Sequence, residues 1–269
     1  MPGLQLADAS LHYLERGAGP LALFVHGFPL DATLWLDQLE ALADVRRCVA
    51  IDLRGFGRSE PTRLPVLSME QHADDLAAAI RALGAPAADV VALSMGGYVA
   101  LALVERHPGL VRSLALVDTK AAPDSEQARR GRDEAAARLL REGRHALAGD
   151  LLAALLAPRA TDVARARLRS MIEGTRYETV LAALEGMKQR QDRTHVLEHL
   201  RIPVAVVVGA EDTLTPPEEA REMVRRVPGA RLTVVPGAGH LTPLEAPGAL
   251  AQVLRELWTA AAPRAGPTV

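Results

Sequence analysis

The 269-residue sequence contains a single cysteine, Cys48, which excludes an intramolecular disulfide and a thiolate-rich metal site. No cluster of histidines and carboxylates has metal-ligand spacing, so we expect no metal. The stretch RGFGRS at 54–59 has two glycines of a dinucleotide-binding motif but lacks the third, and no Walker pattern occurs. We therefore expect no phosphate-bearing cofactor.

Positive charge is not in excess. Lysines and arginines number 31 against 33 aspartates and glutamates, which gives a formal net charge of −2. A protein without a basic field has little attraction for a phosphate backbone, so we expect no nucleic-acid partner.

Long hydrophobic runs are also absent. The uncharged run at 90–104 has fifteen residues and ends in a charged stretch, whereas a membrane span takes about 20 apolar residues. The N-terminal stretch MPGLQLADASLHYLERG lacks the basic start and the apolar core of a signal peptide. These features predict a cytoplasmic protein with no membrane partner.

Asparagine does not occur, and lysine is found only at Lys120 and Lys188. Both residues have AT-rich codons, so a GC-rich genome would suppress them together. Lysine depletion runs against the usual trend of hyperthermophiles. Codon bias is the simpler explanation, and it indicates a bacterial source.

Short apolar runs alternate with longer amphipathic ones, a pattern typical of an α/β protein with a parallel sheet wrapped by helices. The predicted strands are 21–27, 47–53, 89–94, 113–118, 203–209 and 231–237. A helix is predicted over 68–84, where Ser68 and Gln71 have capping-box spacing and Gly84 provides a stop. A second helix is predicted from the prolines at 216–217 to the arginines that end near 226.

The alternation breaks between 119 and 201, where an Ala/Arg/Leu/Glu-rich segment predicts four or five helices inserted between the fourth and fifth strands. The remaining core comprises 1–118 and 202–269. We expect a flanking antiparallel hairpin before residue 21 and a frayed tail at 261–269.

Three chemically useful side chains follow predicted strands: Ser94, Asp212 and His240. Because ligands bind beyond the carboxyl ends of strands in open parallel sheets, these side chains are expected to meet there. A serine, a histidine and a carboxylate form the nucleophile, base and orienting acid that acyl transfer requires.

Ser94 is the predicted nucleophile. A sharp strand-to-helix turn would lift its hydroxyl above the sheet, and such a turn needs small residues two positions to either side. Those residues are Ala92 and Gly96, so the motif ALSMG departs from G-x-S-x-G only in its first glycine.

Among the eight histidines, only His240 lies on a glycine-rich loop after the last strand, and it is the predicted general base. His26 is expected to brace its own loop, and the other six to be at the surface or at helix ends. Asp212 is favoured as the acid, with Asp118 as the alternative. Asp52 is expected to be structural, pairing with Arg54 or with the loop that follows.

A developing oxyanion needs fixed donors, and two backbone N–H groups are candidates. Met95 would begin the helix after Ser94, where amides have no intrahelical acceptor. Phe28, in the HGFP loop, could supply the second donor.

With these residues assembled, the chain resembles the α/β-hydrolase fold family over nearly its full length. The matching motifs, in the family's order, are HGFP (26–29), DLRGFGRS (52–59), ALSMGGYVAL (92–101), GAEDTLTPP (209–217) and PGAGHLTPLEAP (236–247). The resemblance implies the roles given above for Ser94, His240, Asp212, Phe28 and Met95, and a helical cap at 119–201. It is greatest to carboxylesterases and enol-lactonase-like hydrolases.

The predicted function is cleavage of a small carboxylic ester or lactone through an acyl-enzyme. Aromatic residues are only 3% of the chain, so a mainly aliphatic pocket is expected. Ser94 argues against the dehalogenases and epoxide hydrolases of this fold, which use an aspartate nucleophile. Carbon–carbon bond hydrolases, cofactor-free perhydrolases and hydroxynitrile lyases keep the same triad and stay open, as does a non-catalytic ligand receptor.

Overall fold

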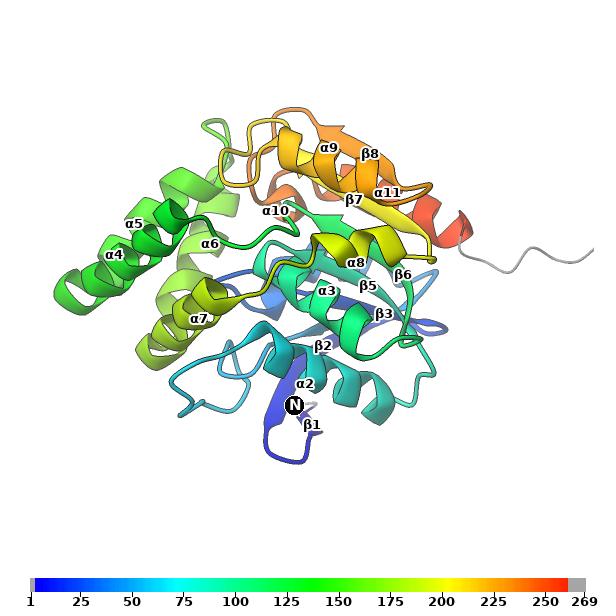
Figure 1. Cartoon of the computed structure of the whole chain (residues 1–269), viewed down its shortest axis with the longest axis horizontal. Helices are drawn as coiled ribbons and strands as arrows, with labels where there is room; N and C mark the ends of the chain where they lie inside the picture. The colour runs from blue at the N-terminus through cyan, green and yellow to red at the C-terminus, as the bar shows by residue number, and fades with distance from the viewer. Residues whose placement is uncertain (1–2, 261–269) are drawn as a thin grey trace, which may run out of the picture.

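An eight-stranded sheet forms the centre of the structure, a computed structural model that describes residues 3–260 (Figure 1). The strand order is β1-β2-β4-β3-β5-β6-β7-β8. The first two strands pair antiparallel with each other, β2 pairs antiparallel with β4, and the rest are parallel. The strands are β1 (Gly3–Gln5), β2 (Ser10–Arg16), β3 (Leu21–Val25), β4 (Arg47–Ile51), β5 (Ala88–Leu93), β6 (Val111–Val117), β7 (Val204–Gly209) and β8 (Arg231–Val235).

All six strands predicted from the sequence are present, and so is the N-terminal hairpin. Most end one or two residues earlier than predicted, because the residues after them turn away into the loops that carry the polar motifs. The expected tail at 261–269 lies outside the described residues. The mostly parallel α/β architecture is thus confirmed.

Helices cover both faces of the sheet, as the continuous apolar strands require. One face is covered by α2 (Met69–Ala82), α3 (Met95–Arg106), α8 (Thr194–His199) and α9 (Pro217–Arg226), and the other by η1 (Ala32–Trp35), α1 (Leu36–Leu42), α10 (Thr242–Glu245) and α11 (Pro247–Ala260). Successive strand residues alternate between the two cores: Leu23 packs in the first and Phe24 in the second.

The predicted helix signals act locally as expected. Ser68 caps α2, accepting a hydrogen bond at 3.1 Å from the amide of Gln71. Gly84, just beyond the last turn, has a φ of +73°, the left-handed conformation that glycine adopts most easily.

Five helices lie between β6 and β7, in agreement with the predicted insertion. Four of them, α4 (Glu126–Glu142), α5 (Arg144–Leu155), α6 (Asp162–Gly174) and α7 (Tyr177–Gln189), gather at the left of Figure 1. The fifth, α8, packs instead against α3 and α9. The division into a core and a separate cap stays a prediction, and we use "cap helices" for α4–α7 as a name only.

Hydrogen bonds to backbone carbonyls connect the cap helices to the loops around the sheet. Thr175 donates to the carbonyl of Pro29 at 3.0 Å, and Thr179 donates to that of Gly55 at 2.8 Å. The amide of Leu67 donates to the carbonyl of Ala182 at 2.9 Å. These bonds hold α7 and the turn that precedes it against the loops that leave β3 and β4.

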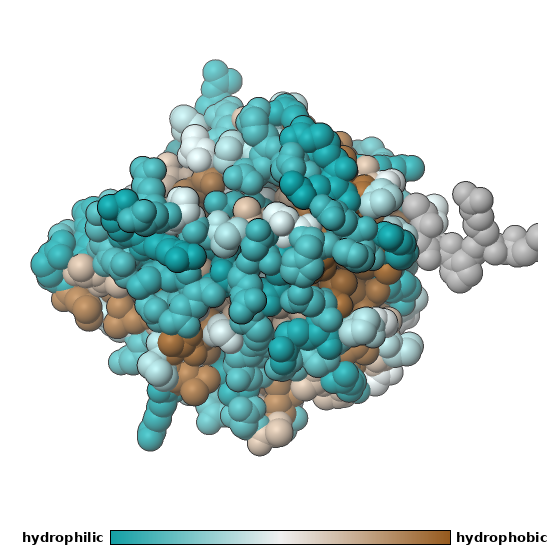
Figure 2. Space-filling model, viewed as in Figure 1, coloured by the Kyte–Doolittle hydropathy of each residue, from teal (hydrophilic) through white to brown (hydrophobic). Residues whose placement is uncertain are grey.

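The surface facing the reader in Figure 2 is mostly hydrophilic, with small hydrophobic areas separated by polar residues. Within residues 3–260, no helix combines the length and the apolar character that crossing a bilayer needs.

Candidate active site

Ser94 lies in the turn between β5 and α3, with φ 52° and ψ −116°. Positive φ is unusual for a residue other than glycine, and it needs support from the surroundings. Its amide donates to the carbonyl of Val117 at 3.0 Å, and its carbonyl accepts from the hydroxyl of Thr119 at 2.7 Å. The adjacent strand β6 therefore holds the turn in its strained shape.

The turn also depends on close backbone packing at Gly96. A Cβ placed there would lie 2.6 Å from the carbonyl oxygen of Val25 and 2.8 Å from that of His26. Those backbone atoms belong to the end of β3 and cannot move without disturbing the sheet. The small residue expected at this position is required by its surroundings, whereas alanine is accommodated at 92.

We expect Gly96→Ala to lower the free energy of unfolding by about 1–3 kcal/mol, because the added methyl group overpacks this contact. Turnover should fall as well, since the turn carries Ser94. Gly149→Ala is a matched control, because a Cβ there meets nothing within 4 Å. Because Gly149 lies within a helix, its replacement by alanine should raise the free energy of unfolding by up to about 1 kcal/mol. Urea unfolding of both variants checks this, and equal stabilities would contradict it.

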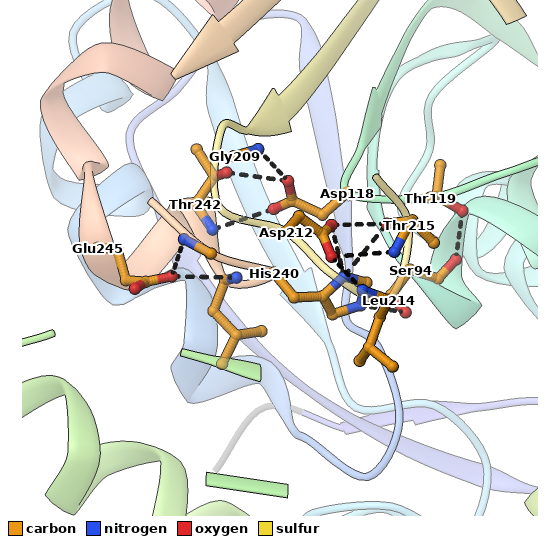
Figure 3. Close-up of polar contacts among 12 residues, drawn as sticks. Ser94, Asp118, Thr119, Gly209, Asp212, Leu214, Thr215, His240, Thr242 and Glu245 are labelled. Carbon is orange, nitrogen blue, oxygen red and sulfur yellow. Dashed lines mark hydrogen bonds and ion pairs between the residues drawn. The ribbon is translucent and has the colours of Figure 1, made fainter. Parts of the chain in front are cut away.

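The three predicted side chains meet at the carboxyl edge of the sheet (Figure 3). Nε2 of His240 lies 2.8 Å from Oγ of Ser94, and Nδ1 lies 2.8 Å from Oδ2 of Asp212. The acidic partner fixes the imidazole with its proton on Nδ1, which leaves Nε2 free to accept the serine proton.

Asp212 is oriented by its own loop. Its Oδ1 accepts from the amides of Leu214 and Thr215 at 2.8 and 2.9 Å, and its Oδ2 accepts from the Thr215 hydroxyl at 2.7 Å. Burial raises the pKa of Asp212, but the hydrogen bond and charge of His240, together with Thr215, outweigh burial and bring the pKa below its ordinary value. The carboxylate therefore remains ionised beside the imidazole.

His240 is only 3% exposed. Burial lowers its pKa, but the hydrogen bond and charge of Asp212, followed by the charges of Asp118 and Glu245, raise it above the ordinary value. The imidazole is thus a stronger base than one free in solution.

Activity should therefore decline as pH falls through this raised pKa, because a protonated imidazole cannot accept the Ser94 proton. In Asp118→Asn the charge that ionised Asp118 places near His240 is lost, so the start of the acid limb near pH 7, where Asp118 is ionised, should move to lower pH. The measurement is kcat/KM between about pH 5 and pH 9 in both proteins. Asp162→Asn, an exposed change on α6, serves as the control. If the acid limb lay at the same pH in Asp118→Asn and Asp162→Asn, the charge of Asp118 would not be raising the pKa of the catalytic base, His240.

Asp118, the alternative acid, has a different set of partners. Its carboxylate accepts from the amide of Gly209 at 2.9 Å and from the amide and hydroxyl of Thr242, both at 3.0 Å. Burial raises the pKa of Asp118 to about 7. Its geometry is that of a brace between β6, β7 and the His240 loop, whereas Asp212 makes the hydrogen bond to the imidazole.

The two candidate oxyanion donors belong to segments next to Ser94. Met95 is the first residue of α3, and Phe28 lines the same cavity as Ser94. A Cβ added at the intervening Gly27 would lie 3.1 Å from Cβ of Ser94, so the Phe28 loop passes close by. A tetrahedral oxyanion needs such fixed donors, and the roles of the Phe28 and Met95 amides stay predictions.

His26 braces its loop as predicted. Its Nδ1 donates to the carbonyl of Gly27 at 2.8 Å, and its Nε2 accepts from the amide of Leu53 at 3.1 Å. That pattern requires a neutral ring, and burial lowers the pKa of His26 accordingly.

One prediction nearby needs correction. His72 lies in the first turn of α2 but is fully buried, beside the ring of Phe56, and burial lowers its pKa to about 3. The prediction for Asp52 is confirmed in its second form: Asp52 is structural and accepts from the amide of Arg58 in the following loop at 2.9 Å. The guanidinium of Arg54 bonds to Asp75 instead.

Sequence reasoning missed a residue that connects the cap helices to the base. Glu245 accepts from the amides of Ala157 and Gly239 at 2.7 and 2.9 Å. The amide of His240 donates in turn to the carbonyl of Leu155 at 2.9 Å. The end of α5 and the His240 loop are therefore bonded to each other. Glu245 stands within the quoted PGAGHLTPLEAP motif, which was the available signal.

Ser94 opens into a cavity of about 340 Å³ between the strand ends and the cap helices. Its walls are largely aliphatic, as expected, and include Leu147, Leu151, Leu155, Leu184, Met187 and Leu214. Charged groups line one part of it: Lys120, Asp124 and Arg132. A groove of about 440 Å³ between α3 and α8 is larger but contains no member of the triad.

An open, mostly parallel sheet that presents a hydrogen-bonded Ser-His-Asp set at its carboxyl edge defines a recognisable class of α/β proteins. Within that class, the chain belongs to the alpha/beta hydrolase fold family, which matches residues 20–247. The family resemblance expected from the five motifs is confirmed.

Similar proteins include esterases and lactonases. The structure of a thermophilic esterase from Thermogutta terrifontis, with malate bound, has a TM-score of 0.92 and 37% identity, covering 97% of this chain and 99% of that chain. The enol-lactonase from Burkholderia xenovorans LB400 has a TM-score of 0.88 and 26% identity, covering 96% of this chain and 100% of that chain.

A curated relative is longer than this chain. The dihydrolipoyllysine-residue acetyltransferase component of the acetoin cleaving system of Cupriavidus necator is 32% identical over 253 residues. Those residues are 90% of this chain but 65% of that protein, so the chain spans just under two thirds of its length.

Proposed function

We propose that the protein is a serine hydrolase that cleaves small carboxylic esters or lactones through an acyl-enzyme intermediate. The observation that carries this proposal is the continuous hydrogen-bonded set from Ser94 Oγ through His240 to Asp212, with both bonds at 2.8 Å. Similarity to an esterase and an enol-lactonase supports the choice of substrate class.

In the first half of the reaction, Oγ of Ser94 bonds to the substrate carbonyl carbon while its proton passes to Nε2 of His240. The carbonyl oxygen becomes an oxyanion and accepts hydrogen bonds from the amides of Phe28 and Met95. When the tetrahedral intermediate collapses, the carbon–oxygen bond to the alcohol breaks, and His240 gives its proton to the departing oxygen.

In the second half, water attacks the acyl group on Ser94. His240 takes the proton of that water, and a second oxyanion forms in the same place. Collapse releases the carboxylic acid and returns the proton to Ser94. Asp212 stays ionised throughout and stabilises the imidazolium each time it forms.

The decisive experiment is labelling with a fluorophosphonate probe, followed by mass spectrometry of the digested protein. An adduct on Ser94 that is lost after Ser94→Ala supports the proposal. Absence of any adduct on the folded protein would favour a non-catalytic ligand receptor.

A substrate panel then separates the chemistries that share this triad. We expect hydrolysis of p-nitrophenyl esters or lactones to exceed that of vinylogous diketones. The opposite order would instead favour a carbon–carbon bond hydrolase. Peroxide-dependent formation of peracid from an ester, at a rate above hydrolysis, would favour a perhydrolase.

A further inference from the structure

The charged part of the Ser94 cavity contains more cations than its protein anions can neutralise. Asp124 is the one carboxylate among the described residues that line the cavity, and two guanidiniums share it. Arg132 donates to it from Nε and, at 3.2 Å, from Nη2, and Arg190 donates from Nη1 at 2.5 Å. Arg132, Arg190 and Asp124 thus form a cluster of two cations and one anion at this part of the cavity.

Asp124 is fully engaged in that cluster. Burial raises its pKa, but the hydrogen bond and charge of Arg132, with the charge of Arg190, outweigh burial and hold the pKa below its ordinary value. Arg190 is further held by the ring of Tyr98, whose centroid lies 4.1 Å from its guanidinium carbon. The cluster is therefore fixed, with one positive charge left over.

Lys120 is the remaining charged residue that lines the cavity. It is half-buried and lines the cavity, yet no carboxylate in the described part of the chain forms an ion pair with it. The only other lysine, Lys188, lies on α7 and has two such partners, Asp133 at 2.6 Å and Glu185 at 2.9 Å. Lys120 is thus left facing an aliphatic cavity without a counter-charge.

The position of Lys120 brings this charge near the reacting atoms. Val117, at the end of β6, is paired with Leu93 at the end of β5. Thr119 bonds to the carbonyl of Ser94 at 2.7 Å, and Lys120 is the next residue. A cation among apolar walls is stabilised by an anion that enters with the ligand.

We propose that the substrate of this site carries a free carboxylate, and that Lys120 binds it while Ser94 attacks an ester or lactone carbonyl a few bonds away. The inference rests on the proposed function and narrows it to short anionic esters or lactones. The cavity is lined by Lys120, Arg132 and Asp124, a surplus of one positive charge, and Arg190 adds a second behind Asp124. In a chain whose net charge is −2, this local excess selects anionic molecules by charge.

The test compares two esters of the same shape. Ethyl hydrogen glutarate carries a carboxylate, and the ethyl ester of glutaramic acid carries a neutral amide in its place. We expect the wild-type protein to favour the carboxylate by about tenfold or more in kcat/KM, as a charge-assisted hydrogen bond in a partly buried site provides. Lys120→Gln should lower that ratio by a similar factor, mainly through a higher KM.

The measured quantity is the ratio of kcat/KM for the carboxylate ester to that for the amide ester. A general loss of activity caused by the substitution lowers both values and leaves this ratio unchanged. Lys188→Gln should keep the wild-type ratio, and Lys120→Arg should keep most of it. Free glutarate should compete with the amide ester in wild-type protein and compete less in Lys120→Gln. A wild-type ratio of one or below, or a ratio unchanged in Lys120→Gln, would overturn the inference.

Failure of the inference can be told apart from failure of the proposed function. If the fluorophosphonate labels Ser94 and the amide ester is cleaved at least as well as the carboxylate, only the substrate class is wrong. If neither ester is cleaved and Ser94 is not labelled, the hydrolase proposal itself fails.

Discussion

Replacing Ser94 by alanine is expected to reduce kcat by roughly 10⁶-fold, the scale of loss when a triad nucleophile is removed. The reason is geometric: Oγ of Ser94 is the atom that Nε2 of His240 contacts at 2.8 Å. Alanine keeps the Cβ, so the cavity, the oxyanion donors and the packing of the turn remain. Binding of a non-hydrolysed ligand, measured by calorimetry, should therefore persist.

The control for this substitution is Ser170→Ala, an exposed serine on α6, which should leave kcat and the melting temperature unchanged. Residual activity of Ser94→Ala within about a hundredfold of wild type would mean that another group supplies the nucleophile. Activity that was lost together with the folded structure would be uninformative about chemistry, so circular dichroism accompanies the assay.

The placement of Ser94 and Phe28 side by side follows from topology that sequence motifs could only imply. The chain adds β4 on one side of β3 and then β5 on the other. The loops after β3 and β5 therefore flank the point where the strand order reverses, which is where open α/β sheets bind ligands. Motif order predicted the residues, and the reversal explains why they meet.

His72 shows how a local pattern was available but not used. It stands three residues after Met69 and four before Leu76, both of which are buried on the same face of α2. That spacing predicts a buried position, whatever the residue type. Histidine usually lies near the surface, but at this position the helical periodicity decides burial and the residue type does not.

Other features depend on contacts between distant segments, which a local motif does not specify. Lys120 is distinctive only because residues of α4, α5 and α7 line the same cavity, and the sequence did not predict where these three helices lie. Glu245 bonds to the end of α5, 88 residues away along the chain. Contacts of this kind come from tertiary packing, which composition and periodicity do not determine.

The choice between two acids near His240 leads to the second large effect. Asp212→Asn should lower kcat by about 10⁴-fold, because an amide in place of the carboxylate stabilises the wrong tautomer of the imidazole and provides no charge for the imidazolium. Asp118→Asn should cost no more than about tenfold in kcat, since Asp118 bonds to Gly209 and Thr242 and not to the ring.

The expected effects on stability are the reverse of those on turnover: Asp118→Asn should be the less stable variant and Asp212→Asn the less active one. Asp118 is fully buried and accepts from three donors, and an asparagine must turn an N–H toward one of them. Its melting temperature should therefore fall, while its kcat, measured below that temperature, stays close to wild type. Asp212→Asn is expected to stay folded and to lose turnover. If Asp118→Asn alone abolished turnover in a folded protein, the acid would be Asp118, and the 2.8 Å contact between Asp212 and His240 would be structural.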